Sequence, residues 1–118
     1  MVYISTELNP VRIVLGQTKS VELMIKITNT SVKARTISCD LILSPQLAFE
    51  KNGRTSSKTI KLGEMDPGTS KIKYFDIYPK MSITKKPQDI LIQAIEHYQD
   101  KYDYILGKKI NKIHLRIE

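Results

Sequence analysis

The side chains that could support nucleophilic chemistry are few. Cys39 is the single cysteine of the chain, and it falls on the inward face of a strand predicted from the alternation around it. A nucleophilic cysteine needs an exposed, electropositive position and a nearby base, whereas a buried free cysteine behaves as a small apolar residue. We therefore expect Cys39 to be structural.

The two histidines and two of the aspartates form no recognisable metal motif. His97 and His114 could meet if the last two predicted strands pair, but the sequence places no further ligands beside them. Asp100 and Asp103 fall in a predicted hairpin loop, where calcium would need about six oxygen ligands and Lys101 would oppose it. We expect no metal and no cofactor.

Motifs of phosphate binding and hydrolysis are missing from the sequence as well. Gly63 and Gly68 are too sparse for a phosphate-cradling loop, and neither precedes a convincing helix. The sequence contains no G-x-S-x-G motif and no H-E-x-x-H motif. These observations together predict a protein that is not an enzyme.

Tyrosines are the residues that most favour a binding role. Three cluster near one predicted turn and two lie on an earlier predicted strand, namely Tyr98, Tyr102 and Tyr104, and Tyr74 and Tyr78. Tyrosine is enriched at binding hot spots because it combines a large apolar ring with a polar tip. It is also a common cross-strand packing residue. Both interpretations stay open: the five tyrosines bind a protein partner, or they pack within the sheets.

Basic residues provide the second candidate surface. The net charge is +7, and residues 51–86 alone contribute nine bases against three acids. A basic domain can attract nucleic acid through phosphate contacts, although lysine also keeps strands soluble and protects sheet edges. Aromatic residues are not interleaved with the bases, which disfavours a stacking platform for single strands. The candidate nucleic-acid-binding residues are Arg54, Lys58, Lys85, Lys86, Lys108, Lys109 and Lys112.

The composition indicates that strands position these residues. The chain has seventeen Ile, five Val, nine Thr and six Tyr, but only three Ala. Branched and aromatic side chains fit a pleated sheet, and alanine, the best helix former, is scarce. Turn pairs such as Asn-Pro, Asn-Gly and Pro-Gly recur about every 8 to 12 residues, a spacing typical of a sandwich or barrel of short strands.

Eight segments with alternating or near-continuous apolar residues are predicted strands. They are 2–8, 11–15, 20–29, 36–44, 58–62, 71–78, 89–98 and 108–118. Pro10 lacks an amide donor, so it suits an edge strand that breaks and can switch sheets. The alternation changes phase around Tyr74, which predicts either a bulge there or a segment covered on both faces. Residues 88–106 also fit a helical period, so a helix remains the alternative there.

Several turn-level patterns resemble those of immunoglobulin-like sandwich modules. The segment 59–71 ends a strand in Leu62-Gly63, turns at Pro67-Gly68 and begins the next strand at once. Residues 21–29 are similar to an early strand of those modules that ends in an asparagine-led turn, and residues 96–117 are similar to their final hairpin. The named group that the chain resembles is the CARDB-like family of bacterial and archaeal multidomain proteins. The resemblance implies a seven- or eight-stranded antiparallel sandwich with an adhesive or spacer role, often outside the cytoplasm, and it carries over no functional residues.

The sequence as a whole predicts one domain, 1–118, with an all-β fold: an immunoglobulin-like antiparallel β-sandwich of seven or eight strands. No apolar run reaches the roughly 20 residues of a membrane helix. No signal peptide is visible, so we expect a cytoplasmic location if the chain is complete and an extracytoplasmic one if it is an excised domain.

The expected function is that of a non-catalytic protein-interaction or accessory module. It would bind a protein partner through an edge strand, with 2–8 and 89–98 as plausible edge or rim elements, or through a tyrosine-bearing face. The near-continuous apolar start of 89–98 also suits a central strand. A nucleic-acid-binding protein with a Lys-rich face is the alternative, and a carbohydrate- or surface-associated module of a longer chain is a further one. Homo-oligomers through edge strands are also possible on this reading.

Overall fold

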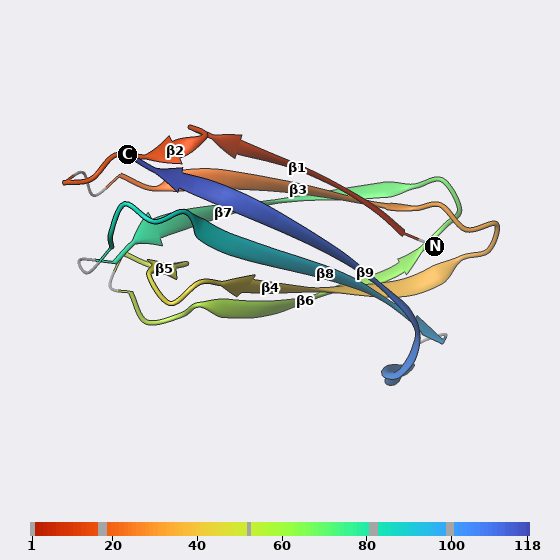
Figure 1. Cartoon of the computed structure of the whole chain (residues 1–118). Helices are drawn as coiled ribbons and strands as arrows, with labels where there is room; N and C mark the ends of the chain where they lie inside the picture. The colour runs from red at the N-terminus through yellow and green to blue at the C-terminus, as the bar shows by residue number, and fades with distance from the viewer. Residues whose placement is uncertain (1, 17–18, 52, 81–82, 99–100) are drawn as a thin grey trace.

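The computed structural model describes residues 2–16, 19–51, 53–80, 83–98 and 101–118. This part of the chain contains nine strands and no helix (Figure 1). The strands are β1 (Val2–Asn9), β2 (Arg12–Ile13), β3 (Val21–Asn29), β4 (Arg35–Leu43), β5 (Leu47–Ala48), β6 (Ser57–Met65), β7 (Ser70–Pro79), β8 (Gln88–Tyr98) and β9 (Lys101–Ile117). The all-β prediction is confirmed, and the helical alternative for 88–106 is wrong because β8 and β9 occupy that segment. The predicted count of seven or eight strands is too low, because the sequence did not indicate β5, a two-residue pairing with β7.

Two sheets face each other and form the sandwich (Figure 1). The four-stranded sheet has the order β1-β3-β7-β5, and the five-stranded sheet has the order β2-β9-β8-β4-β6. The strand pairs are antiparallel except β2 with β9, which is parallel. β1 is an edge strand, as predicted for 2–8. β8 lies between β9 and β4, so the central strand indicated by the apolar start of 89–98 is confirmed, and the interpretation of 89–98 as an edge or rim element is wrong.

Alternating side chains of β3 and β4 form much of the core. The buried rows are Val21, Leu23, Ile25 and Ile27 on β3, and Ile37, Cys39, Leu41 and Leu43 on β4. Because successive strand residues point to opposite faces, each row lies on the side that faces the other sheet. Ile90 and Ile92 of β8 and Leu115 of β9 extend this layer of the five-stranded sheet. The predicted inward faces of β3 and β4 are confirmed.

Pro10 marks the point where the chain changes sheets. β1 pairs with β3 in the four-stranded sheet, whereas β2 pairs with β9 in the five-stranded sheet. Proline has no amide N–H, so it cannot continue the hydrogen-bond ladder of β1. The predicted sheet switch is confirmed, but the strand expected over 11–15 is only Arg12–Ile13.

A register shift lies in β6. Ile37 of β4 is opposite Gly63 and Ser38 is opposite Lys61, so Leu62 is the extra residue of a bulge. Gly63 has a φ of 78°, a left-handed conformation that glycine adopts without a steric cost. β6 continues through the bulge, so the strand end predicted at Gly63 is wrong.

β7 has no such irregularity. It pairs with β3 in one unbroken register. Ile72 and Tyr74 point away from the other sheet, and both are exposed. The prediction of a bulge or a doubly covered segment at Tyr74 is therefore wrong: the apolar residues that broke the alternation lie on the outer face.

A buried asparagine joins the two sheets where β3 ends. Asn29 Nδ2 donates hydrogen bonds to the carbonyl oxygens of Met65, at 2.9 Å, and Lys33, at 3.0 Å. Its Oδ1 accepts hydrogen bonds from the backbone N–H and the hydroxyl of Ser31. Asn29 belongs to the four-stranded sheet and Met65 to the five-stranded one, so this side chain ties the β3–β4 corner to the end of β6.

Candidate functional site

Cys39 lies inside the sandwich and is 2% exposed. Burial, followed by the charge of Asp40, raises the pKa of its thiol to about 12. At neutral pH the residue is therefore a neutral thiol without access to solvent, whereas nucleophilic chemistry needs the thiolate. The predicted inward position of Cys39 is confirmed.

The two histidines do not meet, although β8 and β9 pair. His97 on β8 is opposite Ile105, and His114 on β9 is opposite Asp89. His114 is exposed, and its Nδ1 lies 2.6 Å from Asp89 Oδ1. His97 is 3% exposed, and its Nε2 lies 2.7 Å from Ser38 Oγ. His97 is thus a packed residue near the turn of the β8–β9 hairpin, a role that the sequence did not indicate.

The acidic residues of the hairpin do not gather with other ligands. Within the described ranges, no three His, Cys, Asp or Glu side chains come together as a metal site would require. Asp103 is exposed on β9, and Asp100 lies outside the described residues. In the same part of the chain, no helix has the length and apolar character needed to cross a membrane.

The start of β9 covers the outer side of His97. The rings of His97 and Tyr102 lie 5.0 Å apart, measured between their centroids. Lys61 Nζ of β6 lies 4.7 Å from the centroid of the Tyr102 ring, in a cation–π contact. The β8–β9 pairing shifts register on both sides of His97, and such shifts bend a hairpin. Tyr102 is consequently half-buried, and its contacts are structural.

Four other large apolar side chains near the turn of this hairpin are exposed, and together they are called the hairpin patch. They are Tyr98 at 43%, Tyr104 at 57%, Ile105 at 47% and Leu106 at 44% exposure. The rings of Tyr98 and Tyr104 lie 5.6 Å apart, which joins the contributions of β8 and β9. Sequence reasoning selected the two tyrosines but missed Ile105 and Leu106. The available signal was an Ile-Leu pair directly after the tyrosine cluster.

Tyr74 and Tyr78 lie on the other sheet. Tyr74 is 61% exposed on the outer face of the four-stranded sheet, opposite Met24 and two residues from Ile72. Tyr78 is half-buried and pairs with Ala48 of β5. The structure therefore brings together the three tyrosines of the β8–β9 hairpin and leaves the two tyrosines of β7 apart from them.

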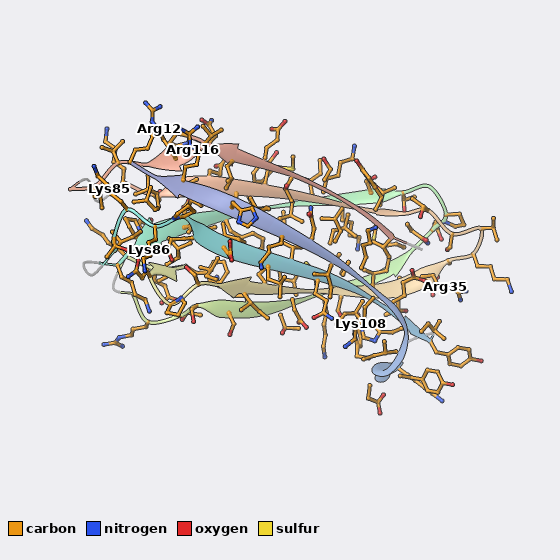
Figure 2. All side chains as sticks on the ribbon, viewed as in Figure 1. Arg12, Arg35, Lys85, Lys86, Lys108 and Arg116 are labelled. Atoms are coloured by element: carbon orange, nitrogen blue, oxygen red, sulfur yellow. The ribbon has the colours of Figure 1, made fainter. Side chains whose placement is uncertain are left out.

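The seven candidate bases do not gather on one face. Lys85 and Lys86 lie at the end of the sandwich that also holds Arg12 and Arg116, whereas Lys108 lies toward the other end (Figure 2). The molecule extends 47 Å along its longest axis. Because salt screens exposed charges beyond about 8 Å at physiological ionic strength, the bases at the two ends act separately on a ligand.

The remaining candidate bases point in different directions. Lys58 Nζ lies over the rings of two phenylalanines, 5.0 and 5.9 Å from their centroids. On β9, Lys108 and Lys112 occupy the outer face of the sheet, and Lys109 has the opposite orientation because strand residues alternate. Arg54 is exposed in the loop before β6.

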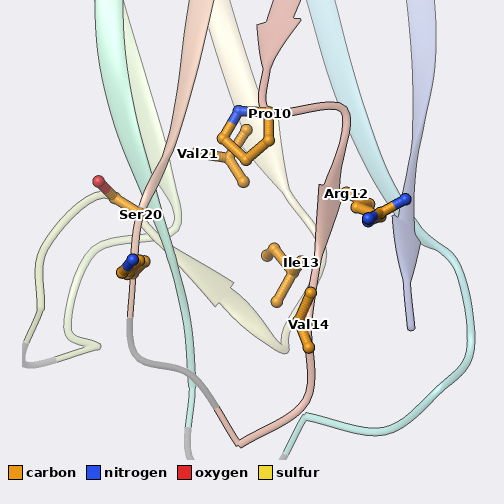
Figure 3. Close-up of a pocket in the computed structure, with 7 residues that line it drawn as sticks. Pro10, Arg12, Ile13, Val14, Ser20 and Val21 are labelled. Carbon is orange, nitrogen blue, oxygen red and sulfur yellow. The ribbon is translucent and has the colours of Figure 1, made fainter.

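A depression of about 220 Å³ lies beside the passage from β1 to β2 (Figure 3). Its lining consists of Pro10, Arg12, Ile13, Val14, Lys19, Ser20 and Val21. Arg12 Nε lies 3.3 Å from Glu118 Oε2, so the charge of Arg12 already has a partner. The lining contains no carboxylate, imidazole or thiol that could act as a general base, and we assign the depression no chemistry.

No family model and no curated protein match the sequence. Among solved structures, the chain is similar to part of E. coli alpha-2-macroglobulin in its native conformation. The TM-score is 0.62 at 15% sequence identity, over 98% of this chain and 7% of that chain. It is also similar to part of Pseudomonas fluorescens alkylpurine DNA glycosylase AlkC bound to DNA containing an abasic site analog. That TM-score is 0.46 at 17% identity, over 98% of this chain and 30% of that chain.

The likeness to alpha-2-macroglobulin concerns the fold alone. The chain spans a small part of each of the two proteins. At such low identity a shared fold carries no information on site residues, because unrelated functions use the same sandwich. The similarity to alpha-2-macroglobulin is compatible with an immunoglobulin-like β fold, and the chain is an all-β, two-sheet sandwich of that general kind.

Proposed function

We propose that this chain is a non-catalytic protein-interaction module that binds a protein partner through the hairpin patch. The observation that carries the proposal is the exposure of four large apolar side chains on one hairpin: Tyr98, Tyr104, Ile105 and Leu106. Clustered apolar surface is unfavourable in water and commonly marks a site of protein interaction. Tyrosine offers a large contact area and a polar tip, which makes it frequent among binding hot spots.

The turn end of the β8–β9 hairpin is held in place, which supports a preformed binding surface. Tyr102 packs against buried His97, and Lys61 lies over the Tyr102 ring. The imidazole of His97 is in turn oriented by the hydroxyl of Ser38. Side chains of β4, β6 and β8 thereby position the start of β9. A surface positioned in this way loses less conformational entropy when a partner binds.

The other functions suggested by the sequence have less support. Lys85 and Lys86 lie at the opposite end of the sandwich from Lys108, and Lys109 points away from the face that holds Lys108, so a nucleic-acid-binding face would use only some of the candidate bases. The resemblance to the CARDB-like family implies an adhesive or spacer role, which agrees with a non-catalytic module. A carbohydrate- or surface-associated module is the form that this role would take in a longer extracytoplasmic chain.

Capture of the partner, followed by a measured affinity, tests the proposal. The tagged chain is incubated with a lysate of the source organism, with and without nuclease, at about 50 and 200 mM salt. We expect a protein partner that resists both the nuclease and the higher salt. Replacing Tyr98 and Tyr104 with alanine should then weaken binding of the purified partner roughly 10- to 100-fold, as for hot-spot residues elsewhere.

Tyr74→Ala is the matched control, because it removes an exposed tyrosine from the outer face of the other sheet. Its affinity for the partner should stay within about twofold of the wild type, as for residues outside the hot spot. Unchanged affinity in the variant that lacks Tyr98 and Tyr104 would contradict the proposed surface. Capture that disappears with nuclease would instead favour the nucleic-acid-binding function.

A further inference from the structure

β9 presents a long backbone edge beside the hairpin patch. The strand runs over Lys101–Ile117, and one of its edges pairs with β8. On the other edge, β2 pairs with only Arg116 and Ile117. Among the residues that the structure describes, no strand pairs with that edge over 101–115. Unpaired N–H and C=O groups along such an edge are a template for an added strand.

The other sheet edges are less suited to strand addition. β6 carries the Gly63 bulge, and a bulge disrupts the hydrogen-bond ladder of an added strand, whereas the register of β9 is unbroken over 107–115. β5 has only two residues. β1 offers eight residues, but Tyr3 is the single exposed large apolar side chain on it among those described. β9 therefore combines the longest open edge with the most exposed apolar surface.

The side chains of β9 determine which added strand would fit. Residues 101–115 carry four lysines and one aspartate. Lys108, Ile110 and Lys112 lie on the outer face of the sheet at two-residue spacing, and Ile110 is 58% exposed. Lys112 Nζ lies 3.6 Å from Asp89 Oδ2 in an exposed ion pair, which contributes little in water. The edge thus presents a base, an apolar side chain and a base in sequence.

We propose that the open edge of β9 binds an extended acidic segment of a partner protein as an added strand. The inference deepens the proposed function and rests on it. On the outer face, the segment places an apolar side chain opposite Ile110 and acidic side chains opposite Lys108 and Lys112. Backbone hydrogen bonds supply affinity, and the acidic-x-apolar-x-acidic spacing supplies specificity.

A second copy of this chain does not fit the same edge. Antiparallel pairing of two β9 strands about Ile110 would set Lys108 of each copy opposite Lys112 of the other. Like charges directly opposite one another destabilise a strand pair. The acidic segment is the occupant that satisfies both the open backbone and the charges.

The test uses two synthetic nonapeptides and the complete chain labelled with nitrogen-15. The acidic probe has the central sequence glutamate-threonine-isoleucine-threonine-glutamate, and the control probe has lysine in place of each glutamate. NMR titration measures the dissociation constants, and hydrogen exchange of the β9 amides reports strand addition. We expect the acidic probe to bind at least about tenfold more tightly than the control probe and to slow exchange at residues 108–112.

Charge reversal distinguishes binding of the acidic probe at the β9 edge from a general attraction of an acidic peptide to a basic protein. Lys108→Glu combined with Lys112→Glu should reverse the preference, so that the lysine probe binds more tightly. Lys85→Glu combined with Lys86→Glu makes the same change in net charge at the other end of the sandwich and should leave the preference unchanged (Figure 2). Three results would overturn the inference: equal affinities of the wild type for the two probes, an equal loss of the preference for the acidic probe in both double variants, or binding of the acidic probe without slower hydrogen exchange of the β9 amides.

Failure of this inference and failure of the proposed function give different results. If the Tyr98 and Tyr104 variant loses the captured partner while the acidic probe does not bind β9, the inference fails and the hairpin patch stands. If the acidic probe binds β9 while the same variant keeps full affinity for the partner, the edge is supported and the patch is contradicted.

Discussion

Replacing Asn29 with alanine tests whether one buried amide holds the β3–β4 corner against the end of β6. The side chain of Asn29 is 0% exposed, and it takes part in four hydrogen bonds. One of the four, to the carbonyl oxygen of Met65, crosses from the four-stranded to the five-stranded sheet. The substitution removes all four bonds and leaves that carbonyl without this donor.

The expected loss follows from the burial of each bond. The bond to Met65 is buried, and a buried carbonyl left without a donor costs about 1–3 kcal/mol. The other three bonds are only partly buried, so water replaces them in part and together they contribute about 1 kcal/mol. We therefore expect Asn29→Ala to lower the free energy of unfolding by about 3 kcal/mol, a large part of the roughly 5–15 kcal/mol of a typical domain.

Urea denaturation followed by circular dichroism measures this change. With an m-value of about 1.5 kcal/mol/M, a loss of about 3 kcal/mol lowers the midpoint by about 2 M without changing the slope. Ser70→Ala is the matched control, because it removes one exposed hydrogen bond, 2.7 Å long, between Ser70 and Thr28. That control should cost less than about 1 kcal/mol. If Asn29→Ala lowers the free energy of unfolding no more than the control does, the buried hydrogen bond to Met65 does not make the large contribution expected of it.

Two further predictions concern Cys39 and the glycines. Because the fold raises the pKa of Cys39 to about 12, the unfolded chain loses this proton first as the pH rises above about 9, and the folded state is destabilised. Urea denaturation at pH 9 and at about pH 10 measures this effect. Over that interval, the free energy of unfolding of the wild type should fall by about 1 kcal/mol more than that of Cys39→Ala. An equal fall in the two proteins would contradict the prediction. Gly63→Ala should cost about 1 kcal/mol in thermal or urea unfolding, because its φ of 78° is left-handed although no atom lies within 4 Å of the added Cβ. Gly107→Ala is the matched control, because a Cβ added there also has no atom within 4 Å and Gly107 has no positive φ. Its free energy of unfolding should stay within about 0.5 kcal/mol of the wild type. Equal losses in the two variants would exclude backbone strain at Gly63.

The inward faces of β3 and β4 were predictable because a period of two is a local property. Val21 and Ile37 each begin a row of apolar residues whose alternation needs no information about the partner strand. The sheet switch at Pro10 was predictable for a similar reason, since the missing amide N–H acts at that residue itself. The same local rule failed at Tyr74, because exposed apolar side chains on an outer face look like a change of phase.

The candidate site was predictable only in part. The cluster of Tyr98 and Tyr104 is visible in the sequence because the two residues lie close to one turn. The packing of the Tyr102 ring against His97 is not visible, because it depends on register shifts in the β8–β9 pair. The position of Lys61 over the same ring depends on β6, which enters from a distant part of the chain.

By itself, the sequence determined the strand content, the two rows of core residues, the burial of Cys39 and the turns that connect the strands. These properties follow from propensity, side-chain alternation and turn chemistry, all of which act over a few residues. Only the tertiary structure decided which strands flank β8, that β9 leaves an open edge, and that Lys85 and Lys86 lie at the opposite end of the sandwich from Lys108. Strand order and register depend on contacts between segments far apart along the chain, and no local pattern specifies which strands become neighbours.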